Sequence, residues 1–107
     1  MAVTPLLPSE LRERLAAGED LLLLDVREDE ERALCAIEGS LHIPMGELSV
    51  RHVELDPERP TVCVCHHGIR SAHVAAALEG LGFDRLYNLS GGIDRWAVEV
   101  EPGMTRY

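Results

Sequence analysis

Cys65-His66-His67-Gly68-Ile69-Arg70-Ser71 is the stretch of this 107-residue chain that best indicates its fold. It directly follows a short apolar run, residues 61–64, and directly precedes an alanine-rich segment with helical spacing. A strand, a tight loop and a helix in this order are typical of a parallel α/β sheet. Ligands of such sheets bind beyond the carboxyl ends of the strands, and the sequence places Cys65 there.

The position of Cys65 also predicts its chemistry. Backbone N–H groups of a tight loop can converge on one point, and the dipole of the following helix adds positive potential there. Both effects favour an anionic sulfur, which is the nucleophilic form of cysteine. We therefore expect Cys65 to be a nucleophile rather than an ordinary core cysteine.

Four apolar runs predict the strands of the sheet. The run at residues 21–26 is continuous rather than alternating, which is typical of a parallel strand covered on both faces. The other strands are expected at residues 40–43, 61–64 and 86–89. The strands alternate with helical segments, so we expect helices on both faces of the sheet.

Helical patterns fill the intervening segments. Ser9 is a plausible N-cap of a first helix that ends at Gly18, and Gly80 with Gly82 should stop the helix that starts at Ser71. Shorter helices are expected at residues 28–33 and 46–55, and in a last turn that carries Trp96 in the core. The acidic stretches 28–31 and 99–101 should be solvated faces.

Composition narrows the function. The net charge of −9 argues against a nucleic-acid partner. The longest aliphatic run, residues 21–24, is too short to span a membrane, and residues 1–8 lack the basic start of a signal peptide. The three cysteines then indicate free thiols in a reduced, cytoplasmic compartment. We expect a single domain over residues 1–107, with its core at about 9–97 and a tail at 98–107, and no cofactor.

The other cysteines and the histidines have alternative readings. Cys63 should point to the same side of its strand as Cys65, as a packed core residue or as a resolving thiol. Cys35 is expected to be a packed residue. The spacing of His66 and His67 from these thiols matches no closed zinc set, so we expect no metal. The two imidazoles should instead shape the mouth of the loop and offer hydrogen bonds.

Three charged residues belong to the candidate site. Arg70 could contact a ligand or support the loop, and the sequence favours neither. Asp25 and Arg27 straddle the end of a strand, where they form either a local ion pair or a second wall of the crevice. We class both as supporting residues.

At this point the chain resembles the rhodanese-like family of single-domain sulfurtransferases over about residues 9–96. The resemblance rests on four ordered landmarks: Leu23-Leu24-Asp25-Val26-Arg27-Glu28, Gly39-Ser40-Leu41-His42-Ile43-Pro44, Val64-Cys65-His66-His67-Gly68-Ile69-Arg70-Ser71 and Asn88-Leu89-Ser90-Gly91-Gly92-Ile93 with Trp96. It implies a single rhodanese-like α/β domain with a five-stranded, mostly parallel sheet and an active-site loop from Cys65 to Arg70.

The resemblance also implies a reaction. Cys65 would take a sulfane sulfur from thiosulfate, a persulfide or a polysulfide and pass it to cyanide, a thiol or a sulfur-carrier protein. The substrate would be held by the loop residues His66, His67, Gly68, Ile69, Arg70 and Ser71. A sulfur-carrier or interaction module without turnover is the alternative. A phosphatase or arsenate reductase is less favoured, because phosphatases that resemble rhodaneses have five residues between cysteine and arginine, whereas this loop has four.

Overall fold

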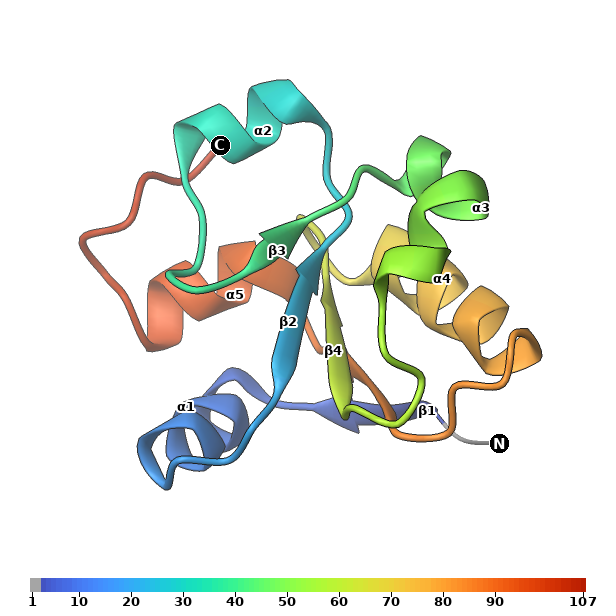
Figure 1. Cartoon of the computed structure of the whole chain (residues 1–107). Helices are drawn as coiled ribbons and strands as arrows, with labels where there is room; N and C mark the ends of the chain where they lie inside the picture. Colours follow the sequence, from blue (N-terminus) through green and yellow to red (C-terminus); the bar gives the residue numbers. More distant parts are fainter. Residues whose placement is uncertain (1–2) are drawn as a thin grey trace.

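Five parallel strands in the order β1-β5-β4-β2-β3 form the sheet of the computed structural model, which describes residues 3–107 (Figure 1). The strands are β1 (Val3–Leu6), β2 (Leu22–Asp25), β3 (Leu41–His42), β4 (Thr61–Val64) and β5 (Leu86–Leu89). Every residue of β2 and β4 is buried, as their unbroken apolar sequences predict. The predicted α/β fold is confirmed, with the five strands that the family resemblance implied.

Helices cover both faces of this sheet (Figure 1). They are α1 (Pro8–Ala16), α2 (Asp29–Leu34), α3 (Leu48–Arg51), α4 (Ile69–Gly80) and α5 (Gly92–Glu99), with the 3-10 turns η1 (Met45–Glu47) and η2 (His52–Glu54) on either side of α3. Leu11 of α1 and Trp96 of α5 pack with Val62 on one face. Val74 and Leu78 of α4 pack with Cys63 on the other. Trp96 therefore lies in the core, as predicted.

The first strand was missed by the sequence interpretation. β1 pairs with β5, from Val3 opposite Leu86 to Leu6 opposite Leu89, so the sheet begins before the expected core at 9–97. Pro5 lies within β1, where it lacks an N–H to donate. An edge strand tolerates this loss, because only one of its sides is hydrogen-bonded.

Two predicted helix starts were wrong. The helix α1 begins at Pro8 rather than after Ser9, because proline suits the first helical position and the Glu10 carboxylate accepts the N–H of Leu7 at 2.8 Å. It ends at Ala16, and Gly18, with a φ of 81°, follows the C-cap Ala17 as the predicted stop. The helix α4 begins at Ile69 rather than Ser71.

The segment at residues 46–55 is a short α-helix between two 3-10 turns rather than one helix. Hydrogen bonds of the 3-10 type close both ends, from Glu47 N–H to the Pro44 carbonyl and from Leu55 N–H to the His52 carbonyl. Val50 and Val53 are exposed, so no apolar stripe runs along the segment to hold a longer helix against the core.

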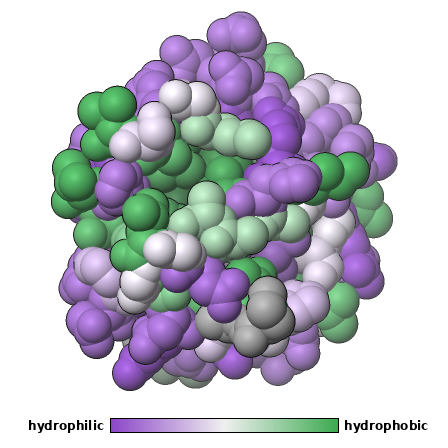
Figure 2. Space-filling view, turned by 90° about the vertical axis from the view of Figure 1, so that its right-hand side faces the viewer, coloured by the Kyte–Doolittle hydropathy of each residue, from purple (hydrophilic) through white to green (hydrophobic). Residues whose placement is uncertain are grey.

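A hollow with apolar walls lies on the face that α3 and α4 form (Figure 2). Its volume is about 260 Å³. The lining residues are Met45, Leu48, Ser49, His73, Val74, Ala77, Leu78 and Leu81. His73 is the only titratable side chain among them, so this hollow offers little chemistry. Among the residues that the structure describes, no helix has the length and apolar character needed to cross a membrane.

Candidate active site around Cys65

The loop that carries Cys65 is a tight turn between β4 and α4. Gly68 closes the turn with a φ of 103°, a conformation that side-chain-bearing residues rarely adopt. A Cβ atom at this position would also lie 3.3 Å from the Leu89 carbonyl oxygen. This turn brings the N–H of Gly68 back onto the sulfur, to which it donates at 3.0 Å. The glycine is therefore what aims a backbone donor at Cys65.

The sulfur of Cys65, a residue that is 1% exposed, receives a second polar contact. The Ser71 hydroxyl lies 3.2 Å from Sγ and 2.5 Å from Oδ1 of Asn88, while the Asn88 amide donates to the Gly68 carbonyl at 3.0 Å. A hydroxyl has one proton, so Ser71 donates either to the sulfur or to Asn88. An anionic sulfur attracts this proton more strongly than a neutral thiol does. The surroundings of Cys65 are thus built to hold negative charge despite its burial.

The N-terminus of α5 supports the loop from behind. The N–H groups of Ile93 and Asp94 donate to the carbonyls of Cys65 and His66, at 2.8 and 3.1 Å. This close approach requires glycine at position 92, where a Cβ atom would lie 2.3 Å from the His66 carbonyl oxygen. The φ of Gly92, 64°, is also in the left-handed region. The pair Gly91-Gly92 therefore lets α5 fix the loop backbone.

Replacing Gly92 by alanine is expected to destabilise the protein by about 2 kcal/mol or more, because the left-handed backbone is strained and the new Cβ collides with two carbonyl groups. Urea unfolding measures this loss. Gly80→Ala is the matched control: no atom lies within 4 Å of its Cβ position, and its φ is not positive. Equal stability of the two variants would show that α5 does not hold the loop in place.

The mouth of the site is a pocket of about 290 Å³ directly over the loop. It is lined by Cys65, His66, His67, Ile69 and Arg70. Ile69 is 71% exposed and forms an apolar rim. A pocket of this size has room for a small molecule beside Cys65.

Arg70 supports the loop from the side of α2. Its Nη1 and Nη2 donate to the two carboxylate oxygens of Glu31 at 2.7 and 2.8 Å. These bonds lower the pKa of Glu31 to about 2, so the pair stays ionised through the neutral range. This pair shows that Arg70 supports the loop through Glu31, while its place in the pocket wall keeps the ligand-contact reading open.

Comparison with known proteins identifies the family of this chain. A family model described as a rhodanese-like domain matches residues 7–99. The chain belongs to the rhodanese-like family. This rhodanese-like domain is 36% identical over 102 residues to the putative sulfurtransferase YtwF of Bacillus subtilis, with 95% of this chain and 98% of that protein covered. It is 40% identical over 87 residues to a sulfurtransferase of Allochromatium vinosum, with 81% of each chain covered.

Solved structures agree with this membership. The crystal structure of a rhodanese-like domain protein from Staphylococcus aureus superposes with a TM-score of 0.84 at 29% identity, covering 97% of this chain and 98% of the other. The superposition shows that this chain shares its fold with that protein, and the loop after β4 lies at the carboxyl edge of the sheet, where the sequence placed it.

Asp25 and Arg27 form a buried pair rather than a wall of the pocket. Arg27 is fully buried, and its Nε and Nη2 donate to the Asp25 carboxylate at 2.9 and 2.7 Å. Burial alone would raise the pKa of Asp25, but the bonds from Arg27 keep it below its usual value. Arg27 also donates to the carbonyls of Glu31 and Cys35. Its role in the rhodanese-like domain is to anchor α2 to the end of β2.

Tyr107 belongs to the site although no sequence pattern pointed to it. Its ring stacks on His66 with the centroids 3.9 Å apart. Its hydroxyl accepts from Arg27 at 3.0 Å and donates to Glu31 at 2.7 Å. The expected tail at 98–107 thus returns to the loop, and Figure 1 shows the chain end beside α2. Tyr107 links the Arg27 pair to the Arg70 pair.

The solvated acidic face expected at 28–31 is in part wrong, whereas Glu99 and Glu101 are exposed as predicted. The side chain of Glu31 is only 18% exposed and faces Arg70. Glu101 accepts a hydrogen bond from the Trp96 indole at 3.0 Å. An acidic run on a short helix predicts exposure, and the approach of Arg70 reverses that prediction at Glu31.

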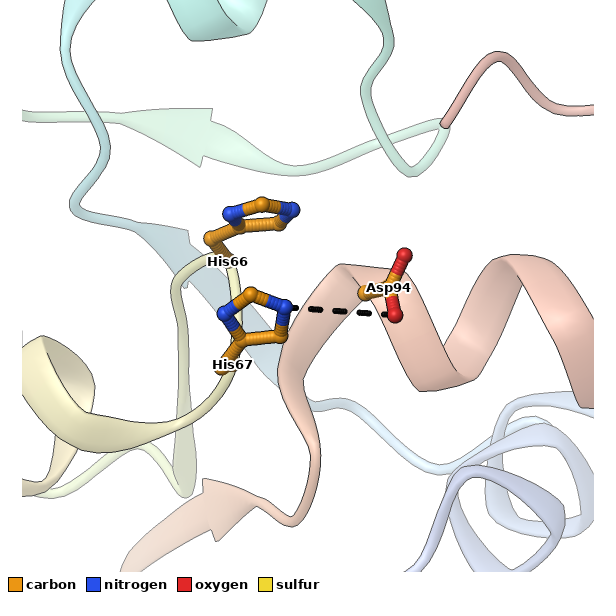
Figure 3. Close-up of side chains that lie close together, drawn as sticks. All are labelled: His66, His67 and Asp94. Atoms are coloured by element: carbon orange, nitrogen blue, oxygen red, sulfur yellow. Dashed lines mark ion pairs between the residues drawn. The ribbon is translucent and has the colours of Figure 1, made fainter. Parts of the chain in front are cut away.

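His66, His67 and Asp94 bring three metal-ligand atoms within 4.8 Å of one another (Figure 3). The two rings are stacked, with centroids 3.9 Å apart and planes at 29°. A metal lies in the plane of each imidazole that binds it, whereas stacked rings direct their nitrogens along two nearly parallel planes rather than at one point. Asp94 also accepts two bonds from Arg106, at 2.9 and 3.2 Å. The cluster as it stands does not fit a metal ion.

The remaining cysteines are not equivalent to Cys65. Burial, with a smaller contribution from Cys65, raises the pKa of Cys63 to about 12. Cys63 therefore stays a neutral core thiol at physiological pH, which favours the packed reading over the resolving one. Cys35 is half-buried, and its sulfur lies 3.7 Å from Nη1 of Arg27.

Proposed function

We propose that this rhodanese-like domain is a sulfurtransferase that carries a sulfane sulfur as a persulfide on Cys65. The observation that supports this most is the pair of donors at the sulfur, the Gly68 N–H at 3.0 Å and the Ser71 hydroxyl at 3.2 Å. Donors fixed before the reaction stabilise an anion without reorganisation. The sulfurtransferase names of its relatives agree with this chemistry.

The proposed reaction has two steps. The Cys65 thiolate attacks the outer sulfur of thiosulfate, a persulfide or a polysulfide, so that a sulfur–sulfur bond forms on the enzyme and the donor leaves with its electron pair. A nucleophilic acceptor, such as cyanide, a thiol or a carrier protein, then attacks the outer sulfur of the persulfide and regenerates the thiolate. A covalent intermediate between two half-reactions gives ping-pong kinetics.

The loop supports sulfur transfer better than phosphate transfer. A cysteine phosphatase needs a cation that faces the tetrahedral phosphate, whereas Arg70 donates to both oxygens of Glu31. The cradle is also small, because Gly68 ends the loop and Ile69 already begins α4. A single sulfur atom suits this cradle.

Mass spectrometry of the intact protein tests the proposal. Incubation with thiosulfate or polysulfide should add one sulfur atom to Cys65, and cyanide should remove it. Repeated cycles of loading and removal would identify an enzyme, whereas a persulfide that only a protein partner discharges would identify a carrier module. Failure of every sulfane donor to add sulfur to Cys65 would refute both.

A further inference from the structure

The positive charge of Arg70 is neutralised before any donor arrives. Both of its terminal nitrogens are bonded to Glu31. Glu31 is itself held in place, because Oε2 accepts the Tyr107 hydroxyl at 2.7 Å and Oε1 accepts the Glu28 N–H at 3.0 Å. Its pKa of about 2 keeps this carboxylate ionised wherever a thiolate reacts. The pair therefore acts on the pocket as a dipole rather than as a cation.

The rest of the pocket supplies no replacement for that charge. Burial and the neighbouring His67 lower the pKa of His66, so this imidazole is neutral at neutral pH. His67 lies 3.9 Å from the Asp94 carboxylate. The remaining residue of the pocket wall, Ile69, is apolar. Hydrogen bonds from the backbone and from a hydroxyl thus stabilise the transferred sulfur. The far end of the sulfur-donor molecule meets a nearly neutral pocket wall. The domain around this pocket has a net charge of −9.

We propose that Glu31 determines which sulfur donors the site prefers: by pairing with Arg70, it makes the pocket favour monoanionic donors, such as persulfides and thiosulfonates, over the thiosulfate dianion. The inference rests on the proposed sulfurtransferase function and extends it to the class of donor. Glu31 is a specificity-determining residue that acts through Arg70 and makes no contact with Cys65 of its own.

The compared reactions follow the same course and differ chiefly in the charge of the donor and of its leaving group. With thiosulfate, the thiolate of Cys65 bonds to the outer sulfur, the sulfur–sulfur bond of the donor breaks, and sulfite leaves as a dianion with the electron pair. With methanethiosulfonate, the same bonds form and break, and methanesulfinate leaves as a monoanion. A methyl group replaces one anionic oxygen, so the two donors are close in size. No proton, oxidant or reductant is needed in either case.

Steady-state kinetics with the two donors, and cyanide as the acceptor, test the inference. Glu31→Gln should increase the ratio of kcat/KM for thiosulfate to that for methanethiosulfonate by about fivefold, because an uncompensated Arg70 attracts the dianion more strongly. Glu30→Gln is the matched control on the same helix: Glu30 is exposed, and its replacement also removes one negative charge. That variant should change the ratio by less than about twofold.

A double variant separates the charge of Arg70 from other effects of the substitution. In Glu31→Gln combined with Arg70→Gln, the ratio should return to that of the wild type, because no unpaired guanidinium remains. An unchanged ratio in Glu31→Gln, or an equal change in Glu30→Gln, would overturn the inference while wild-type turnover left the sulfurtransferase function standing. No persulfide on the wild type with either donor would refute the function itself.

Wild-type kinetics test the inference independently of any variant's folding. With Arg70 compensated, added salt should leave kcat/KM for thiosulfate unchanged or raise it, because salt screens the repulsion between an acidic domain and a dianion. If Arg70 were not compensated by Glu31, added salt should lower kcat/KM for thiosulfate, because it would screen the attraction between the guanidinium and the dianion. A roughly threefold or larger fall in kcat/KM with rising ionic strength contradicts the role given to Glu31.

Discussion

Serine in place of Cys65 is expected to reduce sulfur transfer by at least about a thousandfold while leaving the fold intact, because a hydroxyl forms no persulfide and removing a catalytic nucleophile has effects of this size or larger. The substitution is nearly isosteric, and the introduced hydroxyl would still lie within reach of the donors from Gly68 and Ser71. Cyanide-dependent turnover of thiosulfate, with circular dichroism to verify folding, provides the measurement.

Cys35→Ser is the matched control for this substitution. Cys35 is half-buried and lies outside the pocket over the loop. The variant should keep more than about half of the turnover and should still gain one sulfur atom. Turnover that survives in Cys65→Ser and disappears in Cys35→Ser would transfer the proposed carrier role to the other cysteine.

The second large effect is on stability. Replacing Asp25 by asparagine should lower the free energy of unfolding by about 3 to 5 kcal/mol, because the fully buried guanidinium of Arg27 would lose its counter-charge. Asp25 accepts three bonds from Arg27 and one from Arg32, so a single carboxylate balances both guanidinium groups. Urea unfolding followed by circular dichroism measures the change.

An exposed ion pair provides the reference for that measurement. Asp20 is 82% exposed and lies 2.9 Å from Nη2 of Arg59. Asp20→Asn should change the free energy of unfolding by less than about 1 kcal/mol, because water screens this pair and replaces its contacts. If Asp25→Asn costs no more than Asp20→Asn, then the buried pair does not anchor α2 to the sheet.

Local sequence patterns predicted the central strands and the reactive loop. The strand at 61–64, the strand at 86–89 and the position of Cys65 each follow from a few consecutive residues. A short apolar run without alternation, such as the one at 61–64, is typical of a strand covered on both faces. The glycines of the loop are equally local signals, because a left-handed turn requires them at particular positions.

Features that depend on distant contacts could not be predicted from local patterns. Glu31 has the sequence context of a solvated acid, and only the approach of Arg70 and Tyr107 makes it part of the site. Asn88 resembles any polar residue in a strand until the fold brings Ser71 within 2.5 Å of its side chain. β1 was missed because a short strand that contains a proline carries little periodic signal.

The pairing of β1 with β5 has a consequence for how the molecule assembles. Val3 pairs with Leu86, so the edge strand β1 joins the sheet across most of the length of the chain. Its pairing closes a loop that contains all the residues between these two strands. We expect the entropy lost in closing so long a loop to make this docking a late event in folding. Until it occurs, β5 presents bare amide and carbonyl groups along one side, which are a template for self-association. A truncated protein that lacks residues 3–6 would keep every group of the reaction centre. Its β5 edge would stay unpaired, so we expect this variant to self-associate.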